Sequence, residues 1–301
     1  MSFSVGIVGL PNVGKSTFFK ALTRKPVDIA PYPFTTIHPN VGIVAVPDEK
    51  LKKIAEIIQP EKVTPTVIEF TDIAGLVKNA HKGEGLGNQF LAEIRNCDAI
   101  IEIVRVFQEE KVEHIQGNIE PLRDIEIIRT ELLMKDLETL EKIIKNTEKS
   151  SPPSDKLKIK KLSLLQKIKD NLARGKMISE IGLNAEELTK IKEFQFLTAK
   201  PIIYLFNTGK ENASEELKNQ IKLADNHPLF INLKIEDESS EFSETERKEI
   251  GVESKLDQII IACYNILDLI TFYTIAGGKE ARAWTTKKDS TAPQAGGKIH
   301  S

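Results

Sequence analysis

Short runs of apolar residues alternate along the chain with stretches in which apolar residues recur every three or four positions. The short runs are nearly continuous, as in strands buried on both faces of a parallel sheet, and they predict strands at residues 3–8, 41–46, 67–70, 99–107, 201–206 and 229–235. The helical spacing predicts helices at residues 15–22, 48–58, 87–95, 214–224 and 255–270. This alternation predicts an α/β fold with a doubly wound, mostly parallel sheet.

The segment between residues 107 and 201 interrupts this alternation, because no run in it is typical of a strand. Apolar residues at helical spacing predict one helix at 125–145 and another at 157–172, with a turn at the Ser-Pro-Pro-Ser sequence 151–154. Two antiparallel helices, inserted into the α/β domain as a hairpin, are the simplest arrangement.

The last thirty residues form a third kind of segment. They contain short strand candidates at 271–275 and 281–285, and they are too few for an independent core. We therefore expect the chain to be divided into an α/β domain at 1–124 and 198–271, an inserted hairpin at 125–197 and a partial C-terminal domain at 272–301.

The composition excludes several classes of protein. The chain has 301 residues, of which 40% are apolar and 29% charged, so it is neither disordered nor fibrous. No apolar run approaches the ~18 residues of a membrane span, and the N-terminus does not resemble a signal peptide. Cys97 and Cys263 lie far apart, which fits a reducing compartment. We expect a cytoplasmic protein without a membrane partner.

The charges are unevenly distributed, although the formal net charge is only −2. Residues 142–176 contain eleven Lys and Arg against three Asp and Glu, which gives this stretch +8 and the rest of the chain −10. Basic residues without interleaved aromatic residues favour contacts with nucleic-acid phosphates and argue against sequence-specific DNA binding. A solvated helical face is the alternative explanation.

A phosphate-binding loop is predicted at residues 9–16, whose sequence GLPNVGKS matches G-x-x-x-x-G-K-[ST]. The motif follows a predicted strand and opens a predicted helix, so backbone N–H groups and the helix dipole would face phosphate oxygens. Lys15 would reach the β- and γ-phosphates, and the Ser16 hydroxyl would bind Mg²⁺. The expected nucleotide contacts in this segment are Asn12, Val13, Gly14, Lys15, Ser16 and Thr17.

Two further segments have the composition of nucleotide-sensing switches. Asp72 and Gly75 form a D-x-x-G sequence after the strand at 67–70, which suits a magnesium ligand beside a γ-phosphate sensor. Thr36 is the preferred switch threonine on Mg²⁺, and Thr35 is the alternative. Three glycines at 83–87 predict a second switch loop.

The group that would position the attacking water is left open by the sequence. Many switch GTPases carry Gln directly after the D-x-x-G glycine, whereas this chain has Leu76. The Asn12 carbonyl oxygen could hold a potassium ion against the phosphates in place of an arginine finger. His81 and His114 are the two candidates for the water-positioning residue.

Base recognition is expected after the strand at 201–206, where Asn207 and Thr208 would contact the nucleotide. Guanine readers have Asn-Lys-x-Asp here, and the Asp accepts hydrogen bonds from guanine. Lys210 occupies that position and cannot accept a hydrogen bond. ATP is therefore favoured, while a shift that brings Glu211 into play would keep GTP as an alternative.

Together these motifs resemble the Obg-like ATPases of the YchF type, in the translation-factor class of P-loop proteins. The resemblance covers essentially the whole chain and is carried by residues 9–17, 33–40, 72–76, 82–88, 281–284 and 291–294. It implies a nucleotide domain, an inserted helical hairpin and a C-terminal TGS domain, a small β-grasp module to which residues 272–301 would belong. It also implies preference for ATP over GTP, stimulation by potassium and association with the ribosome.

The resemblance also bears on single residues. The position that matches His114 is proposed in that family to assist hydrolysis, which favours His114 over His81. Lys210 departs from the acid usual at its position, and the base loop of small residues is replaced by Asn-Leu-Lys at 232–234.

The leading hypothesis is an ATPase that binds ribosomal RNA through the basic hairpin. An Obg-like GTPase and a non-hydrolysing, ATP-gated interaction protein are the alternatives.

Overall fold

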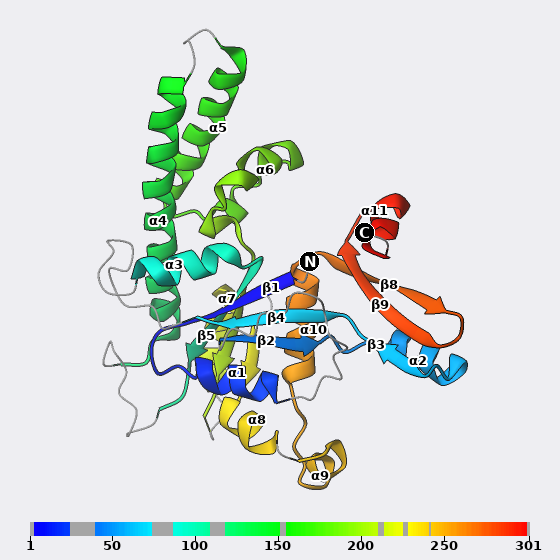
Figure 1. Ribbon diagram of the computed structural model, residues 1–301. Coiled ribbons are helices and arrows are strands. Elements are labelled where there is room, and N and C mark those ends of the chain that lie inside the picture. Colours follow the sequence, from blue (N-terminus) through cyan, green and yellow to red (C-terminus); the bar gives the residue numbers. More distant parts are fainter. Residues whose placement is uncertain are drawn as a thin grey trace.

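The computed structural model of the chain describes residues 3–24, 40–73, 87–108, 118–150, 155–209, 214–224, 228–240 and 242–299 (Figure 1). A six-stranded sheet lies at its centre, with the order β2-β4-β1-β5-β6-β7. The strands are β1 (Phe3–Val8), β2 (Val41–Ala45), β4 (Val67–Asp72), β5 (Ala99–Arg105), β6 (Ile202–Asn207) and β7 (Leu229–Ile231). Neighbouring strands run parallel except for the edge strand β2, which is antiparallel to β4. The predicted doubly wound, mostly parallel sheet is confirmed.

Helices cover this sheet and exclude water from its centre. They are α1 (Lys15–Thr23), α3 (Gly87–Asn96), α7 (Glu215–Ala224), α8 (Leu233–Ser239) and α10 (Leu256–Ile266), whereas the short helix α9 (Glu244–Glu249) lies apart from the sheet (Figure 1). Strand β5 is buried at every position, so both faces of the sheet are covered there. None of the helices in the described ranges is long and apolar enough to cross a membrane.

Two predicted elements were too long, because polar groups end them early. The predicted strand at 229–235 stops at Ile231, since the Asn232 side chain accepts hydrogen bonds from the backbone N–H groups of Lys234 and Ile235 and so begins α8. The predicted helix at 255–270 stops at Ile266. Asp268 then takes a left-handed φ of 52°, which turns the chain into a strand.

The predicted helical hairpin is confirmed and longer than expected, with α4 at Pro121–Ser150 and α5 at Lys156–Ala173. The pair projects from the sheet in Figure 1, and α6 (Ala185–Ile191) lies beside it. Three short 3₁₀ helices lead back to the sheet, at Ile178–Glu180, Lys192–Phe194 and Leu197–Ala199. Buried leucines of both long helices belong to the same apolar cluster as the sheet, so the hairpin is continuous with the main core.

A fully buried carboxylate fixes the chain where it leaves the hairpin. Asp136 of α4 accepts hydrogen bonds from the backbone N–H of Leu197 at 3.0 Å and from the N–H and hydroxyl of Thr198, both at 2.7 Å. Burial raises the pKa of Asp136, and these hydrogen bonds oppose the rise. The return to β6 is thereby held against the base of the hairpin.

The C-terminal segment completes a second, three-stranded sheet of order β3-β9-β8. Its strands are β3 (Lys62–Thr64), β8 (Leu269–Ala276) and β9 (Glu280–Lys287), followed by α11 (Ala292–Ile299). The two predicted C-terminal strands are confirmed, and β3 was missed because only three residues pair with a strand more than 200 positions away. Its small core contains Leu51 of α2 (Glu49–Ile58), so the last residues depend on the N-terminal half of the chain.

One phenol joins this second sheet to the N-terminus of α2. The Tyr273 hydroxyl lies 2.9 Å from both carboxylate oxygens of Asp48. The same carboxylate caps α2 by accepting from the N–H groups of Lys50 and Leu51. Tyr273 therefore stabilises the cap and the contact between the two parts together.

The change Tyr273→Phe is expected to lower the free energy of unfolding by about 1 kcal/mol at neutral pH, because it removes a hydrogen bond to a carboxylate. Burial, reinforced by Asp48, raises the pKa of Tyr273 from 10.0 to about 12. Because the pKa of Tyr273 is higher in the folded than in the unfolded protein, its contribution to the free energy of unfolding is complete below pH 10 and is lost as the pH rises to about 12. Urea denaturation from pH 8 to 12 measures this, and a difference between the two proteins that stays constant over that range would contradict it.

Candidate nucleotide site

A tight turn joins β1 to α1 at the carboxyl edge of the sheet. Gly9 has a φ of 153°, and a Cβ there would lie 2.6 Å from the carbonyl oxygen of Ile103. Asn12 and Gly14 have φ values of 64° and 107°, so the backbone reverses within a few residues. Gly14 then caps α1, whose first N–H groups have no intrahelical partners. The sequence-predicted phosphate loop thus has the backbone shape that an anion site requires.

Lys15 is buried, and its charge is directed into this turn. Its ammonium donates hydrogen bonds to the carbonyl oxygens of Gly9 at 3.1 Å and Leu10 at 2.9 Å. Burial lowers the pKa of Lys15 to about 8, and the nearby Asp72 carboxylate opposes the decrease. A phosphate group in the turn would favour the protonated form, because it brings negative charge to a poorly solvated ammonium.

Ser16 and Asp72 come together although they are 56 residues apart. Asp72 ends β4, beside Ile7 of β1, and its Oδ2 accepts a hydrogen bond from the Ser16 hydroxyl at 3.1 Å. Burial raises the pKa of Asp72, whereas Ser16 and then Lys15 oppose the rise. A hydroxyl and a carboxylate are hard oxygen donors of the kind that Mg²⁺ takes alongside substrate phosphates. These two residues therefore fit the predicted magnesium site.

Asn207 connects this loop to the other side of the site. It ends β6, is 5% exposed, and donates from Nδ2 to the carbonyl oxygen of Val13 at 2.9 Å. Its Oδ1 accepts from the backbone N–H of Leu233, the first residue of α8, at 3.2 Å. One buried amide thus holds both the phosphate loop and the start of α8.

The loops after β6 and β7 are tied to each other in the same way. The Thr208 backbone N–H and hydroxyl lie 2.7 and 3.1 Å from the carbonyl oxygen of Ile231. The Asn232 side chain donates to the carbonyl oxygen of Gly209 at 2.7 Å. Asn207 and Thr208, predicted as nucleotide contacts, are thus buried residues that hold the edge where a base would lie.

The remaining candidates are split between α1 and segments outside the described residues. Thr17 is half-buried in the first turn of α1. The other predicted residues fall outside the ranges that the structure describes: Thr35, Thr36, Gly75, Leu76, His81, His114, Lys210 and Glu211.

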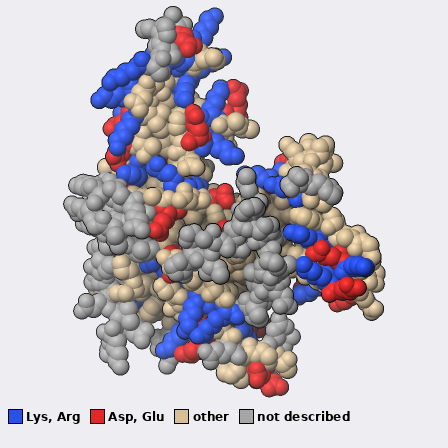
Figure 2. Space-filling view, viewed as in Figure 1, with Lys and Arg blue, Asp and Glu red and all other residues tan. Residues whose placement is uncertain are grey.

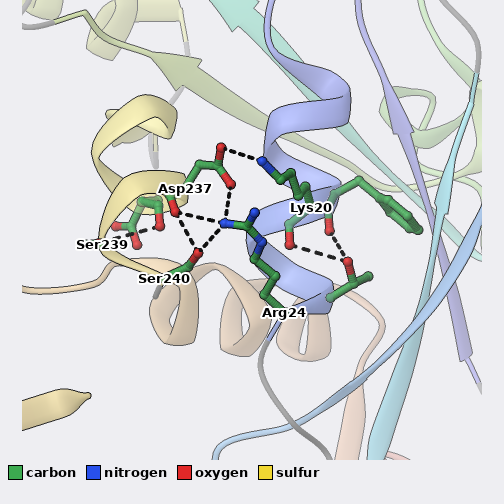
Figure 3. A network of polar contacts seen from close by, with 8 residues as sticks. Lys20, Arg24, Asp237, Ser239 and Ser240 are labelled. Carbon is green, nitrogen blue, oxygen red and sulfur yellow. Dashed lines mark hydrogen bonds and ion pairs between the residues drawn. The ribbon is translucent and has the colours of Figure 1, made fainter. Parts of the chain in front are cut away.

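An ion-pair network behind the site was missed from the sequence (Figure 3). Lys20 of α1 and Arg24, the residue that caps the end of α1, both contact the carboxylate of Asp237 in α8, each at 3.1 Å. The spacing of four between the two cations puts them on one face of α1 and was the signal available. Their acidic partner lies more than 200 positions away, so the pairing could not be read from the sequence.

Comparisons with known proteins agree with this geometry. A family model described as "50S ribosome-binding GTPase" matches residues 4–148, and a C-terminal model for YchF GTPases, described as a protein of unknown function, matches residues 269–301. The ribosome-binding ATPase YchF of Bacillus subtilis is 42% identical over 314 residues, which cover 100% of this chain and 86% of that protein. The chain belongs to the YchF family.

Two further YchF proteins support this membership. The ribosome-binding ATPase YchF of Haemophilus influenzae is 44% identical over 310 residues, which cover 100% of this chain and 85% of that protein. The structure of the Schizosaccharomyces pombe YchF GTPase superposes with a TM-score of 0.86 at 36% identity, covering 99% of this chain and 84% of that one. The resemblance to YchF-type Obg-like ATPases is therefore confirmed across the P-loop domain, the hairpin and the C-terminal strands.

Replacing the glycine that caps α1 tests whether the observed turn binds phosphate. In Gly14→Ala, the new Cβ would lie 2.7 Å from Nδ2 of Asn207 on a backbone with a φ of 107°. The turn must shift away from Asn207, and we expect the dissociation constant of a fluorescent nucleoside triphosphate to rise at least about tenfold. Fluorescence titration measures it.

Gly182→Ala is the matched control, because Gly182 also has a positive φ, 71°, but a Cβ there would meet none of the described atoms within 4 Å. Both variants introduce backbone strain, and only Gly14→Ala should weaken nucleotide binding. Equal affinities in Gly14→Ala and Gly182→Ala would contradict the assignment of this turn as the phosphate site.

Proposed function

We propose that this YchF-family protein is a magnesium-dependent P-loop nucleoside triphosphatase that hydrolyses ATP, and GTP less well, as a nucleotide-switched regulator on the ribosome. The observation that carries the proposal is the convergence of Lys15, Ser16 and Asp72 at one tight turn. A buried cation, a hydroxyl and a carboxylate around unpaired helix N–H groups match the charge pattern of a magnesium-bound triphosphate.

The described residues have distinct parts in this mechanism. Lys15 would exchange its bonds to the carbonyl oxygens of Gly9 and Leu10 for phosphate oxygens, and it would stabilise charge that develops during phosphoryl transfer. The Ser16 hydroxyl and the Asp72 carboxylate would hold Mg²⁺, which neutralises phosphate charge when bound. Asn207 keeps the carbonyl of Val13 turned away from the anion.

Hydrolysis requires a group that positions water, since Leu76 can neither donate nor accept a hydrogen bond. We assign this role to His114, supported by a potassium ion on Asn12. Thr36 would complete the magnesium site and Gly75 would sense the γ-phosphate. Asn12 lies in the phosphate loop with a left-handed φ of 64°.

The preference for ATP rests on the loop that begins at Asn207. Its fourth residue is Lys210, which cannot accept the hydrogen bonds that guanine offers, whereas adenine lacks that pair of donors. The names of the relatives differ on this point: the Bacillus subtilis protein is called an ATPase and the Schizosaccharomyces pombe protein a GTPase. A direct competition between the two nucleotides is therefore the decisive measurement.

The hairpin is the proposed contact with ribosomal RNA, and its charge is more localised than the sequence alone indicates. In the described part of the basic stretch 142–176, four cations pair with acids on the same or neighbouring helices, in the ion pairs Lys142–Glu138, Lys161–Glu193, Lys167–Glu187 and Lys169–Glu141. Residues 125–197 as a whole contain fifteen Lys and Arg and twelve Asp and Glu, a net charge of +3. Exposed lysines remain near the far end of α4 and α5, where Figure 2 shows blue side chains.

The proposed division of labour follows the predicted boundaries. Residues 1–124 and 198–271 would form the nucleotide domain, 125–197 the RNA-binding arm, and 272–301 part of a TGS domain. A ribosomal partner implies a cytoplasmic site of action, with which the buried free thiols Cys97 and Cys263 are compatible.

We expect ATP to displace a fluorescent nucleotide from the 301-residue chain at lower concentration than GTP. We also expect magnesium-dependent release of phosphate that is faster in potassium than in sodium, because potassium would replace an arginine finger. Lys15→Met should abolish turnover, since it removes the buried charge beside the phosphates without adding a charge of its own.

A tenfold preference for GTP would contradict the ATP assignment and favour the GTPase alternative. Tight ATP binding without phosphate release in either salt would favour the non-hydrolysing alternative. Full activity of His114→Ala would remove that residue from the mechanism.

Neutralising the far end of the hairpin should weaken ribosome binding. The variant replaces four exposed lysines with alanine, at Lys145, Lys149, Lys156 and Lys160. Each lysine that contacts a phosphate adds roughly 0.7–0.9 to the magnitude of the slope of log association constant against log salt concentration. Removing four such lysines should therefore lower the magnitude of that slope by about three. Ribosome co-sedimentation across a salt series measures this slope.

A variant with four exposed lysines replaced elsewhere, Lys50, Lys53, Lys222 and Lys279, controls for net charge. It should bind ribosomes as the parent does. Salt-insensitive binding of the parent, or equal losses in both variants, would contradict the hairpin as the contact.

A further inference from the structure

Helix α8 contacts the phosphate loop at its start and the carboxyl end of α1 at its other end. At its start, the Leu233 side chain packs against Gly14, where a Cβ would lie 3.0 Å from Leu233 Cδ1. The Asn207 side chain also accepts a hydrogen bond from the N–H of Leu233 and donates one to the carbonyl oxygen of Val13. At its other end, the Asp237 carboxylate lies between Lys20 of α1 and Arg24, the residue that caps α1. The loop that begins α8 is one of the two that border the proposed base site.

The contacts at the second end form a network rather than a single ion pair (Figure 3). Lys20 Nζ lies 3.1 Å from Asp237 Oδ2, and Arg24 Nη1 lies 3.1 Å from Oδ1. The same guanidinium nitrogen donates to the Asp237 carbonyl oxygen at 3.3 Å and to the Ser240 hydroxyl oxygen at 3.1 Å. The Ser240 hydroxyl in turn donates to the Asp237 carbonyl oxygen at 2.6 Å. Arg24 thereby caps the carboxyl end of α8.

The helix dipole makes the position of Asp237, in the last turn of α8, unfavourable for α8 by itself. An acid in the last turn of a helix faces the negative end of the dipole and destabilises that helix, whereas cations at the end of α1 are favourable. Asp237 is therefore in an unfavourable position for α8 by itself, and the two cations of α1 compensate. What the network stabilises is the placement of α8 relative to α1.

We propose that Lys20 and Arg24, acting through Asp237, are positioning residues for the nucleoside part of the ligand. Helix α1 carries the phosphate-binding residues Lys15 and Ser16, and α8 carries the loop at the base side. The network fixes the distance between these two parts of the site. It therefore controls how well the site can bind the base and the triphosphate of one nucleotide at the same time. This inference rests on the proposed nucleotide-binding function.

The test compares ATP with tripolyphosphate, which has the phosphates but no nucleoside. In Asp237→Ala, we expect the dissociation constant of magnesium–ATP to rise about three- to fivefold, the range of a partly exposed ion-pair network. The dissociation constant of magnesium–tripolyphosphate should change less than about twofold, because it contacts only the phosphate loop. Alanine favours helix in the last turn, so the change does not melt α8.

Three further variants separate positioning from a general loss of charge. Arg24→Ala should weaken ATP binding in the same direction, and the double variant Arg24→Ala/Asp237→Ala should bind ATP no worse than Asp237→Ala. Glu49→Gln removes an ion pair of 2.8 Å with Lys52 on α2 and should leave both ligands unaffected. Isothermal titration calorimetry with the 301-residue chain measures all of these constants.

Unchanged ATP binding in Asp237→Ala would overturn the inference, and so would equal losses for ATP and tripolyphosphate, which indicate general damage to the phosphate loop. Additive losses in the double variant would show that Arg24 does not act through Asp237. If the parent chain binds neither ATP nor GTP, the proposed function fails and the inference fails with it. Normal binding by the parent together with an unchanged variant overturns the inference alone.

Discussion

The hydrogen bond from the Asn207 amide to the Val13 carbonyl is the constraint on which the site depends. A loop that exposes its N–H groups to an anion must direct its carbonyl groups elsewhere, and a buried carbonyl without a donor is costly. Asn207 supplies that donor from β6 and uses its own oxygen to receive the N–H of Leu233. The shape of the phosphate loop and the start of α8 therefore depend on one buried side chain. Gly14 is required beside it because any Cβ would collide with that amide.

The hairpin shows how the structure changes the meaning of a charge pattern. In the sequence, residues 142–176 carry +8, but acids on α4, on α6 and before β6 pair with part of that charge. The apolar sides of α4 and α5 join the main core, and Asp136 fixes the exit from the hairpin. The arm is thus rigidly continuous with the sheet at its base, while its uncompensated lysines concentrate toward the far end.

Much of the fold could be predicted because it follows from local rules. Continuous apolar runs indicated the strands of the main sheet, and helical spacing indicated α4 and α5 within a few residues of their observed ends. The failures occurred where a single polar residue decided an element, at Asn232, which begins a helix inside a predicted strand, and at Asp268, which ends a predicted helix. Strand β3 was missed since its partner, β9, is distant and its own sequence is short and polar.

The chemistry of the proposed phosphate site follows from the amino-acid sequence alone, because backbone geometry within eight consecutive residues dictates the residue types and spacing of a P-loop. The fold class and the inserted hairpin follow from it too, since both depend on the period of the apolar positions. Chain folding was needed to bring Asp72 to Ser16 and to place Asp237 between Lys20 and Arg24. These pairs lie far apart in the chain, and their contacts arise from strand order and helix packing, which no local pattern encodes.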